Sequence, residues 1–110
     1  MDEKNMQDFE NAARSPEDMR IIQLANVLKA ISHPARLCIV KKLYFNGSCN
    51  VGYFTNCMGI SQSSVSQHLS KMRDLGIVEV KKQGLESYYS VVDEDIKAII
   101  KSLFQEEKNE

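Results

Sequence analysis

Polar side chains able to contact a base pair or a phosphate are concentrated between Ile60 and Arg73. The segment from Gln62 to Arg73 holds four serines and two glutamines, although serine is an indifferent helix former. Hydroxyls and glutamine amides both donate and accept hydrogen bonds, and glutamine can pair with adenine through two bonds in the major groove. This composition favours contact with DNA over the alternative, an ordinary solvated helix face.

A second polar group, Lys81-Lys82-Gln83-Gly84, follows some ten residues later and reads as the approach to a hairpin turn. Lysines there would suit phosphate contacts, whereas the alternative is an edge strand kept soluble by its charges. Both segments supply candidate DNA-contacting residues: Gln62, Ser63, Ser64, Ser66, Gln67, Lys71, Lys81, Lys82 and Gln83.

The distribution of charge permits such a partner. The whole chain has a net charge of −1, but residues 33–90 carry seven basic and three acidic side chains, a local balance of +4. Attraction to phosphate depends on the local field at the contacting face rather than on the total. A basic centre between acidic ends is compatible with DNA binding and does not prove it.

The elements that position these residues follow from hydrophobic periodicity. At about 100° per residue, a helix from Ser61 places Val65, Leu69 and Met72 on its core side. A short helix over about 50–57 and a tight turn at Gly59 precede it, an order typical of a helix-turn-helix. The period then changes to two, which predicts strands at 77–82 and 86–91.

Three further helices complete the predicted fold. The first is capped by Ser15 and followed, after Ser32-His33-Pro34, by a second that ends near Gly47. The last begins after Asp93. The first helix has an apolar stripe at helical spacing, formed by Ile21, Leu24, Ala25, Leu28 and Ile31. Inward positions of the last helix are predicted at Ile96, Ile99, Ile100, Leu103 and Phe104. The fold class is therefore mainly α with a β-hairpin wing, a winged helix-turn-helix of order α-α-α-α-β-β-α.

Length and composition indicate one domain, assigned to residues 16–105, between a flexible N-terminal segment (1–15) and a polar tail (106–110). The apolar stripes of the first and last helices exceed what so small a core can bury, which predicts a homodimer. No apolar run approaches the roughly 20 residues of a membrane span, and no signal-peptide core is visible, so we expect no membrane association and a cytoplasmic location.

Other classes of function have less support. The sequence shows no glycine-rich phosphate loop, nucleophile elbow or spaced carboxylate pair, so we expect neither an enzyme nor a cofactor. A winged helix that binds only proteins is the remaining alternative. Such a module usually lacks the serine- and glutamine-rich helix face found here.

Several motifs resemble the ArsR/SmtB family of winged-helix repressors over residues 17–104. They are His33-Pro-Ala-Arg-Leu37, Ser61-Gln62, Ser66-Gln-His-Leu69, Leu75-Gly-Ile-Val78, Gly84 and Tyr89-Ser-Val91. The segments 62–73 and 83–86 are similar to the PagR-like branch, whose members are not metal sensors. The resemblance implies a dimer built from the first and last helices, the fourth helix in the major groove of operator DNA, a wing reaching phosphate or the minor groove, and repression relieved by a signal.

The family's usual sensing sites are missing from this sequence. The paired cysteines of metal sensors map to Asn50 and Gly52, the last helix has no histidine, and the second-helix cysteine of sulfur sensors maps to Lys41. We therefore expect no metal site. Cys49 and Cys57 remain candidate redox or metal-responsive residues, although about 12 Å of helix would separate them, beyond disulfide reach. Cys38, His33 and His68 are interpreted as structural.

Overall fold

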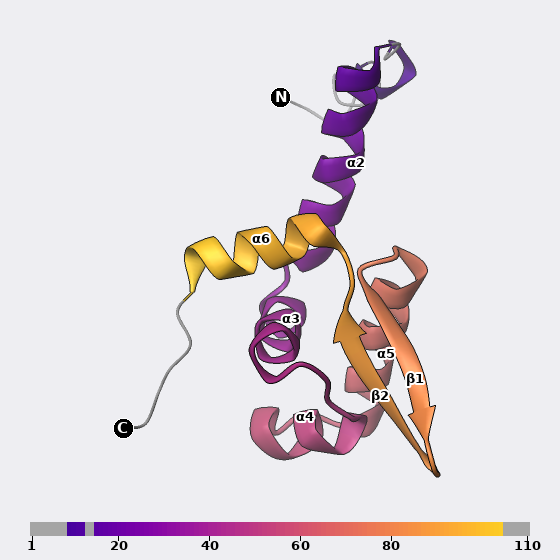
Figure 1. Cartoon of the computed structure of the whole chain (residues 1–110), viewed down its shortest axis with the longest axis vertical. Coiled ribbons are helices and arrows are strands. Elements are labelled where there is room, and N and C mark those ends of the chain that lie inside the picture. The colour runs from indigo at the N-terminus through magenta and orange to yellow at the C-terminus, as the bar shows by residue number, and fades with distance from the viewer. Residues whose placement is uncertain (1–8, 13–14, 105–110) are drawn as a thin grey trace.

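The computed structural model describes residues 9–12 and 15–104 (Figure 1). Residues 9–12 are helical. The remaining elements are α2 (Pro16–Ile31), α3 (Pro34–Asn46), α4 (Val51–Met58), α5 (Gln62–Asp74), β1 (Val78–Gln83), β2 (Glu86–Val91) and α6 (Glu94–Leu103). From Pro16 onward this order confirms the predicted fold class. The polar tail and most of the N-terminal segment predicted to be flexible lie outside the described residues. Within the described ranges, no helix is long and apolar enough to span a bilayer.

Each helix from α2 to α6 begins with a side-chain cap, which explains why the predicted starts hold. A capping side chain accepts a hydrogen bond from a backbone N–H of the first turn and satisfies a donor that has no partner within the helix. The five caps are Ser15, His33, Asn50, Ser61 and Asp93, at donor–acceptor distances of 2.9 to 3.1 Å.

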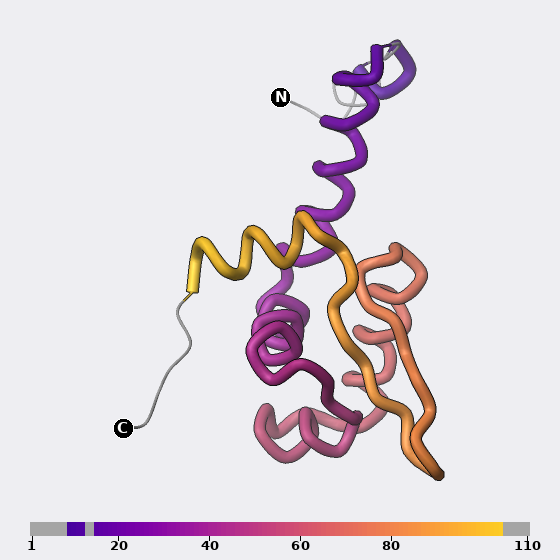
Figure 2. The backbone as a smooth tube through the Cα atoms, in the orientation of Figure 1, coloured from indigo at the N-terminus to yellow at the C-terminus, as the bar shows by residue number. Residues whose placement is uncertain are grey.

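The core surrounds α3, which lies between α6, α4 and the hairpin (Figures 1 and 2). Its fully buried residues come from α3, α4, α5, β1 and α6, together with Ile77 just before β1: Ile39, Val40, Leu43, Phe54, Val65, Leu69, Met72, Ile77, Val78, Ile96 and Ile100. The three core positions predicted for α5 are all among them. The helix that carries the polar face is thus anchored along its whole length.

The apolar stripe predicted for α2 does not face the core along its whole length, and Ala25 in the stripe is exposed. Ile21 and Leu28 are 48% and 42% exposed, and the buried positions of this helix are Val27, Ala30 and Ile31. Helix α2 projects from the body of the protomer, and its buried residues all lie in its C-terminal part (Figure 1). Leu103 of α6, predicted inward, is 67% exposed.

Strands β1 and β2 form an antiparallel hairpin in register from Val78↔Val91 to Gln83↔Glu86. The two turn residues are Gly84 and Leu85, and Gly84 has a φ of 67°, a left-handed conformation that favours glycine. Next to the base of the hairpin, Cys49 pairs with Tyr89 through two backbone hydrogen bonds of 2.8 and 3.0 Å. The wing is thereby joined to the residues that lead into α4.

Candidate nucleic-acid interface

Helices α4 and α5 are joined by a turn that depends on one glycine. Gly59 has a φ of 68° and donates its N–H to the carbonyl of Thr55 at 3.2 Å, which ends α4. Two residues later, Ser61 caps α5. Phe54 of α4 and Val65 of α5 are both fully buried in the shared core. A short turn between two core-anchored helices is the arrangement of a helix-turn-helix.

Helix α5 has one buried face and one polar face. Opposite its three core residues, the predicted DNA-contacting residues Gln62, Ser63, Ser66, Gln67 and Lys71 are all exposed. Ser64 differs, because it is partly buried and its Oγ accepts a hydrogen bond from the Ser61 hydroxyl at 3.0 Å. Its hydroxyl therefore belongs to the helix cap, and it is less available to a ligand than the other five side chains.

The predicted wing residues Lys81, Lys82 and Gln83 are exposed, and Leu85 at the tip is fully exposed. Lys81 lies 3.5 Å from Glu79 in an exposed ion pair, which contributes little to stability. The tip of the hairpin and the first turn of α5 reach the same end of the molecule, opposite to α2 (Figure 1). The candidate residues of the wing and of the first turn of α5 are therefore brought to one end of the protomer, whereas Lys71 lies in the last turn of α5.

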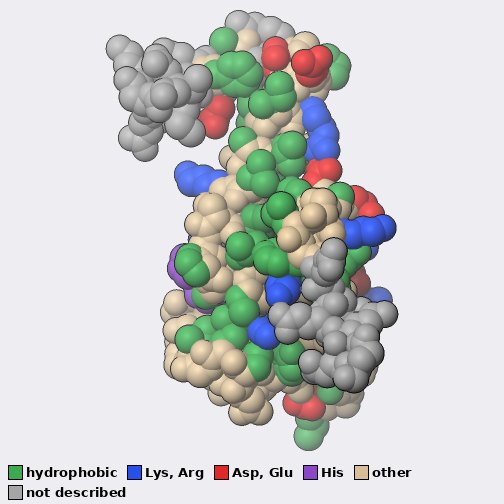
Figure 3. Space-filling view, turned by 90° about the vertical axis from the view of Figure 1, so that its left-hand side faces the viewer, with side chains coloured by type: hydrophobic (Ala, Val, Ile, Leu, Met, Phe, Trp, Pro, Cys, Tyr) green, Lys and Arg blue, Asp and Glu red, His purple; other side chains and the backbone are tan. Residues whose placement is uncertain are grey.

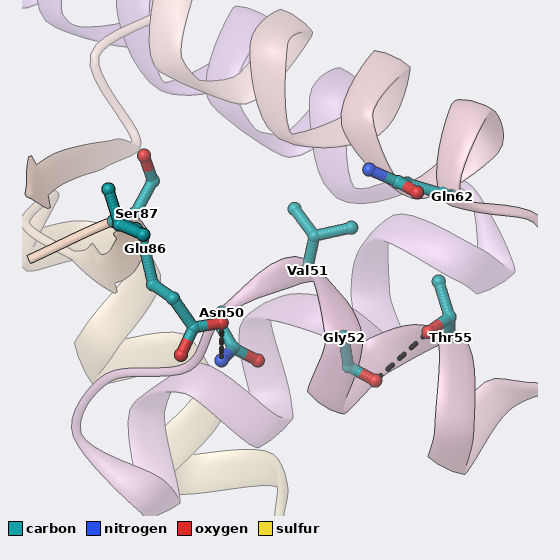
Figure 4. A pocket seen from close by; sticks show the side chains of 8 residues that line it. Asn50, Val51, Gly52, Thr55, Gln62, Glu86 and Ser87 are labelled. Carbon is teal, nitrogen blue, oxygen red and sulfur yellow. Dashed lines mark hydrogen bonds between the residues drawn. The ribbon is translucent and has the colours of Figure 1, made fainter.

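A hollow of about 300 Å³ lies between these elements (Figure 4). It is lined by the start of α4, by Gln62 of α5 and by the wing: Asn50, Val51, Gly52, Thr55, Gln62, Leu85, Glu86 and Ser87. Gln62 and the wing, distant in sequence, thus border one surface. An arrangement with a polar helix on one side of a hollow and a basic hairpin on the other can straddle one backbone strand of a duplex.

Glu86 and Asn50 were not among the predicted site residues. Across the side of the hollow, the amide nitrogen of Asn50 donates to a carboxylate oxygen of Glu86 at 3.0 Å (Figure 4). The other oxygen of Glu86 accepts from the Tyr88 hydroxyl at 3.4 Å. The two partners are 36 residues apart, and no periodicity or short motif signals such a pair.

The three cysteines are free thiols in different surroundings. Cys49 is buried, and this burial raises the pKa of its thiol, which also accepts a hydrogen bond from the Asn46 amide at 3.9 Å. A thiol kept neutral is a poor nucleophile and metal ligand. Cys57 is exposed and Cys38 is partly buried. Among the residues described, no three or more His, Cys, Asp or Glu side chains are grouped to hold a metal ion.

The core-anchored α4–turn–α5 unit and its basic hairpin define a winged helix-turn-helix protein. Comparison with known proteins identifies the family. A profile described as "Bacterial regulatory protein, arsR family" matches residues 33–80. The chain is 41% identical to the transcriptional repressor PagR of Bacillus anthracis, over 79% of this chain and 87% of PagR. It is 40% identical to the HTH-type transcriptional regulator YgaV of Escherichia coli, over 74% of this chain and 82% of YgaV. The chain belongs to the arsR family of bacterial regulatory proteins.

Solved structures agree with this assignment. The crystal structure of PagR superimposes with a TM-score of 0.72 over 78% of this chain and 98% of PagR. A homodimeric winged helix-turn-helix DNA-binding domain, Mb0332 from Mycobacterium bovis, is 26% identical with a TM-score of 0.69, over 84% of this chain and 85% of that domain. The resemblance predicted from the sequence motifs is confirmed, and so is the prediction of a transcriptional regulator.

Proposed function

We propose that this regulator is a homodimeric repressor that binds operator DNA with α5 in the major groove and the wing on the adjoining backbone. The observation that carries the proposal is the shared hollow, which places Gln62 of α5 opposite residues 85–87 of the wing. Gln62 and Gln67 would read base edges, and Lys81 and Lys82 would contact phosphates. Ser63, Ser66, Lys71 and Gln83 would add contacts from the same exposed surfaces.

Exposed apolar side chains on α2 and α6 support the homodimer. Met19, Ile21 and Leu28 of α2 are exposed together with Leu103 of α6. Figure 3 shows hydrophobic side chains gathered along α2 and on the body below it. Patches of this kind mark interaction surfaces. A two-fold dimer would present two copies of α5 and favour an operator with inverted repeats.

An ion pair holds the two helices of this surface together. Arg20 of α2 donates to Asp95 of α6 at 2.6 Å, and this hydrogen bond lowers the pKa of the Asp95 carboxyl. The name of the similar Mycobacterium bovis domain describes it as homodimeric, which agrees with the proposal. A repressor of bacterial operators would act in the cytoplasm, and the proposed contacts need neither a cofactor nor a metal.

The proposal is tested by capturing genomic fragments on the purified protein and sequencing them. A recovered duplex and a scrambled duplex are then compared by fluorescence anisotropy at several salt concentrations. We expect tighter binding to the recovered duplex and a strong decrease of affinity with salt for both. A protein without salt-dependent affinity for any duplex would contradict DNA binding and favour a protein-interaction module.

A further inference from the structure

The outer half of the wing has few attachments to the rest of the protomer. Residues 81–86 are exposed, and a two-stranded hairpin is only marginally stable by itself. Its inner half is fixed by the buried side chains of Val78 and Val91 and by the backbone pairing of Cys49 with Tyr89. Between Tyr89 and the tip, the wing makes one hydrogen bond to the helix-turn-helix among the residues described. This is the bond from the Asn50 amide to the Glu86 carboxylate.

The Asn50 side chain is held from two sides, which gives this bond a defined direction. Its oxygen accepts the backbone N–H of Tyr53 at 2.9 Å and caps α4, so its nitrogen is turned toward the wing. That nitrogen donates to Glu86 at 3.0 Å, and Tyr88 donates to the second carboxylate oxygen at 3.4 Å. One amide therefore connects the start of α4 to the last residue pair of the hairpin ladder, Gln83 and Glu86.

The charge of Glu86 is unfavourable for the proposed partner. Its carboxylate lines the hollow on the side opposite Gln62, and a negatively charged phosphodiester strand would pass between them. No lysine or arginine pairs with it among the ion pairs of the described residues. A carboxylate here would repel DNA, so a role in attracting phosphate is excluded and a role in holding the wing fits the contacts it makes.

We propose that Glu86 is a positioning residue, which fixes the wing relative to α5 through Asn50 and so sets the width of the hollow that receives the DNA backbone. The proposal rests on the proposed function for its consequence in DNA binding. The mechanical part, restraint of the wing by this bond, is independent of it. The two parts are therefore tested by separate measurements.

Four variants separate the bond from the charge. Asn50→Asp keeps a good helix cap but replaces the donor amide by a carboxylate that repels Glu86. Glu86→Ala removes the acceptor and leaves the cap of α4 intact. Glu86→Gln keeps an acceptor oxygen for Asn50 and loses the charge. The double variant Asn50→Asp with Glu86→Gln restores an amide opposite a carboxylate, with the direction of donation reversed. Glu79→Gln is the matched control, because Glu79 is a wing carboxylate that contacts Lys81 of its own strand.

The first measurement is amide hydrogen exchange of residues 82–87 without DNA. We expect about tenfold faster exchange in Asn50→Asp and in Glu86→Ala, and wild-type exchange in Glu86→Gln, in the double variant and in Glu79→Gln. Exchange that is unchanged in both Asn50→Asp and Glu86→Ala would overturn the proposal. So would a double variant that is no better protected than Asn50→Asp.

The second measurement is the ratio of affinities for the recovered duplex and a scrambled duplex. A mispositioned wing lowers this ratio, so we expect a loss of about tenfold in Asn50→Asp that the double variant recovers. If exchange changes in Asn50→Asp but the ratio of affinities for the two duplexes does not, wing position does not determine recognition, and this part of the proposal is overturned. If the wild-type protein binds no duplex, the proposed function fails, and the exchange experiment still decides whether the bond restrains the wing.

Discussion

The imidazole rings of His33 and His68 lie with their centroids 4.8 Å apart and their planes inclined by 53°. The cap of α3 thus touches the middle of α5, the helix that carries the polar face. Burial, the His33 ring and the Arg36 guanidinium all lower the pKa of His68 from its usual value of 6.5, in that order of importance. The neutral form of His68 is the one that fits the folded protein.

This contact predicts how stability depends on pH. Well above pH 6.5, His68 is neutral in both the folded and the unfolded state and its titration does not affect stability. As the pH falls through 6.5, the unfolded chain takes up a proton before the folded protein does. The free energy of unfolding therefore decreases until the pH passes below the folded-state pKa of His68.

Urea unfolding between about pH 5 and pH 8 measures this effect. We expect the decrease to be smaller in His68→Gln, which cannot titrate. His33→Asn keeps a capping side chain on α3 and removes the neighbouring ring, and it should also reduce the decrease. An identical dependence on pH in the wild type and in His68→Gln would show that another group is responsible.

Recognition by the polar face of α5 is tested with its glutamines. Gln62→Ala or Gln67→Ala should each weaken binding to the recovered duplex by about 1–3 kcal/mol if the residue makes a good base contact. Affinity for a scrambled duplex should change much less. Gln23→Ala is the matched control, since Gln23 is an exposed residue of α2, the helix that projects from the opposite end of the molecule (Figure 1). Equal losses on both duplexes would mean that these glutamines do not read bases.

The wing lysines should act on all DNA sequences alike. Removing Lys81 and Lys82 together with alanine should weaken binding to both duplexes and reduce the slope of log affinity against log salt by about 0.9 per lost phosphate contact. Two lysines of α6, Lys97 and Lys101, provide a control with the same change of charge outside the proposed DNA interface. A slope that responds equally to both double variants would point to net charge and not to wing contacts.

Features that depend on residues close together in the sequence were predicted correctly, whereas features that depend on distant residues were not. For α5, a local cap at Ser61 and the spacing of Val65, Leu69 and Met72 determine the buried face, and the prediction was right. Helix α2 is apolar on more than one side, so periodicity alone could not decide that Ile31 would be buried and Ile21 exposed.

Contacts between residues distant in the sequence were not predicted. Asn50 was recognised as the start of a short helix and as a position without a metal-binding cysteine. Glu86 was recognised as the start of a strand and the end of a PagR-like segment. Their hydrogen bond depends on how the wing folds back beside α4, which no local pattern encodes. Likewise, Ser63, Ser64 and Ser66 were all assigned as DNA-contacting candidates, and only the folded cap shows that the Ser64 hydroxyl is engaged by Ser61.

Dimerisation is tested on the exposed apolar face of α2 and α6. Ile21→Glu or Leu103→Glu should weaken the dimer by about a hundredfold or more, because a charge without a partner inside an apolar interface costs several kcal/mol. Affinity for the recovered duplex should fall with it. Sedimentation at micromolar concentration measures the change, with Leu85→Ser as a control that removes an exposed leucine elsewhere. A wild-type protein that sediments as a monomer and still binds the recovered duplex tightly would contradict a dimeric repressor.

The last prediction is that neither zinc nor arsenite will release the protein from DNA. A tight zinc site needs about four well-placed donors, usually thiolates and imidazoles. The Asn50 amide is engaged with Tyr53 and Glu86, and Gly52 has no side chain. On α6, Asp95 is paired with Arg20, and carboxylates on a solvated helix hold zinc weakly and without selectivity.

Cys49 and Cys57 are the residues that test this prediction most directly. Burial raises the pKa of the Cys49 thiol, so a metal binding there has to displace a tightly held proton from a buried group, whereas Cys57 is exposed and can react. Each ion is titrated into the protein–DNA complex under reducing conditions and read by anisotropy, with Cys49→Ser and Cys57→Ser proteins in parallel. We expect all three proteins to remain bound at stoichiometric zinc or arsenite. Stoichiometric release of the wild type that either substitution abolishes would identify a metal-responsive sensor, with donors from two protomers completing a soft-metal site around these thiols.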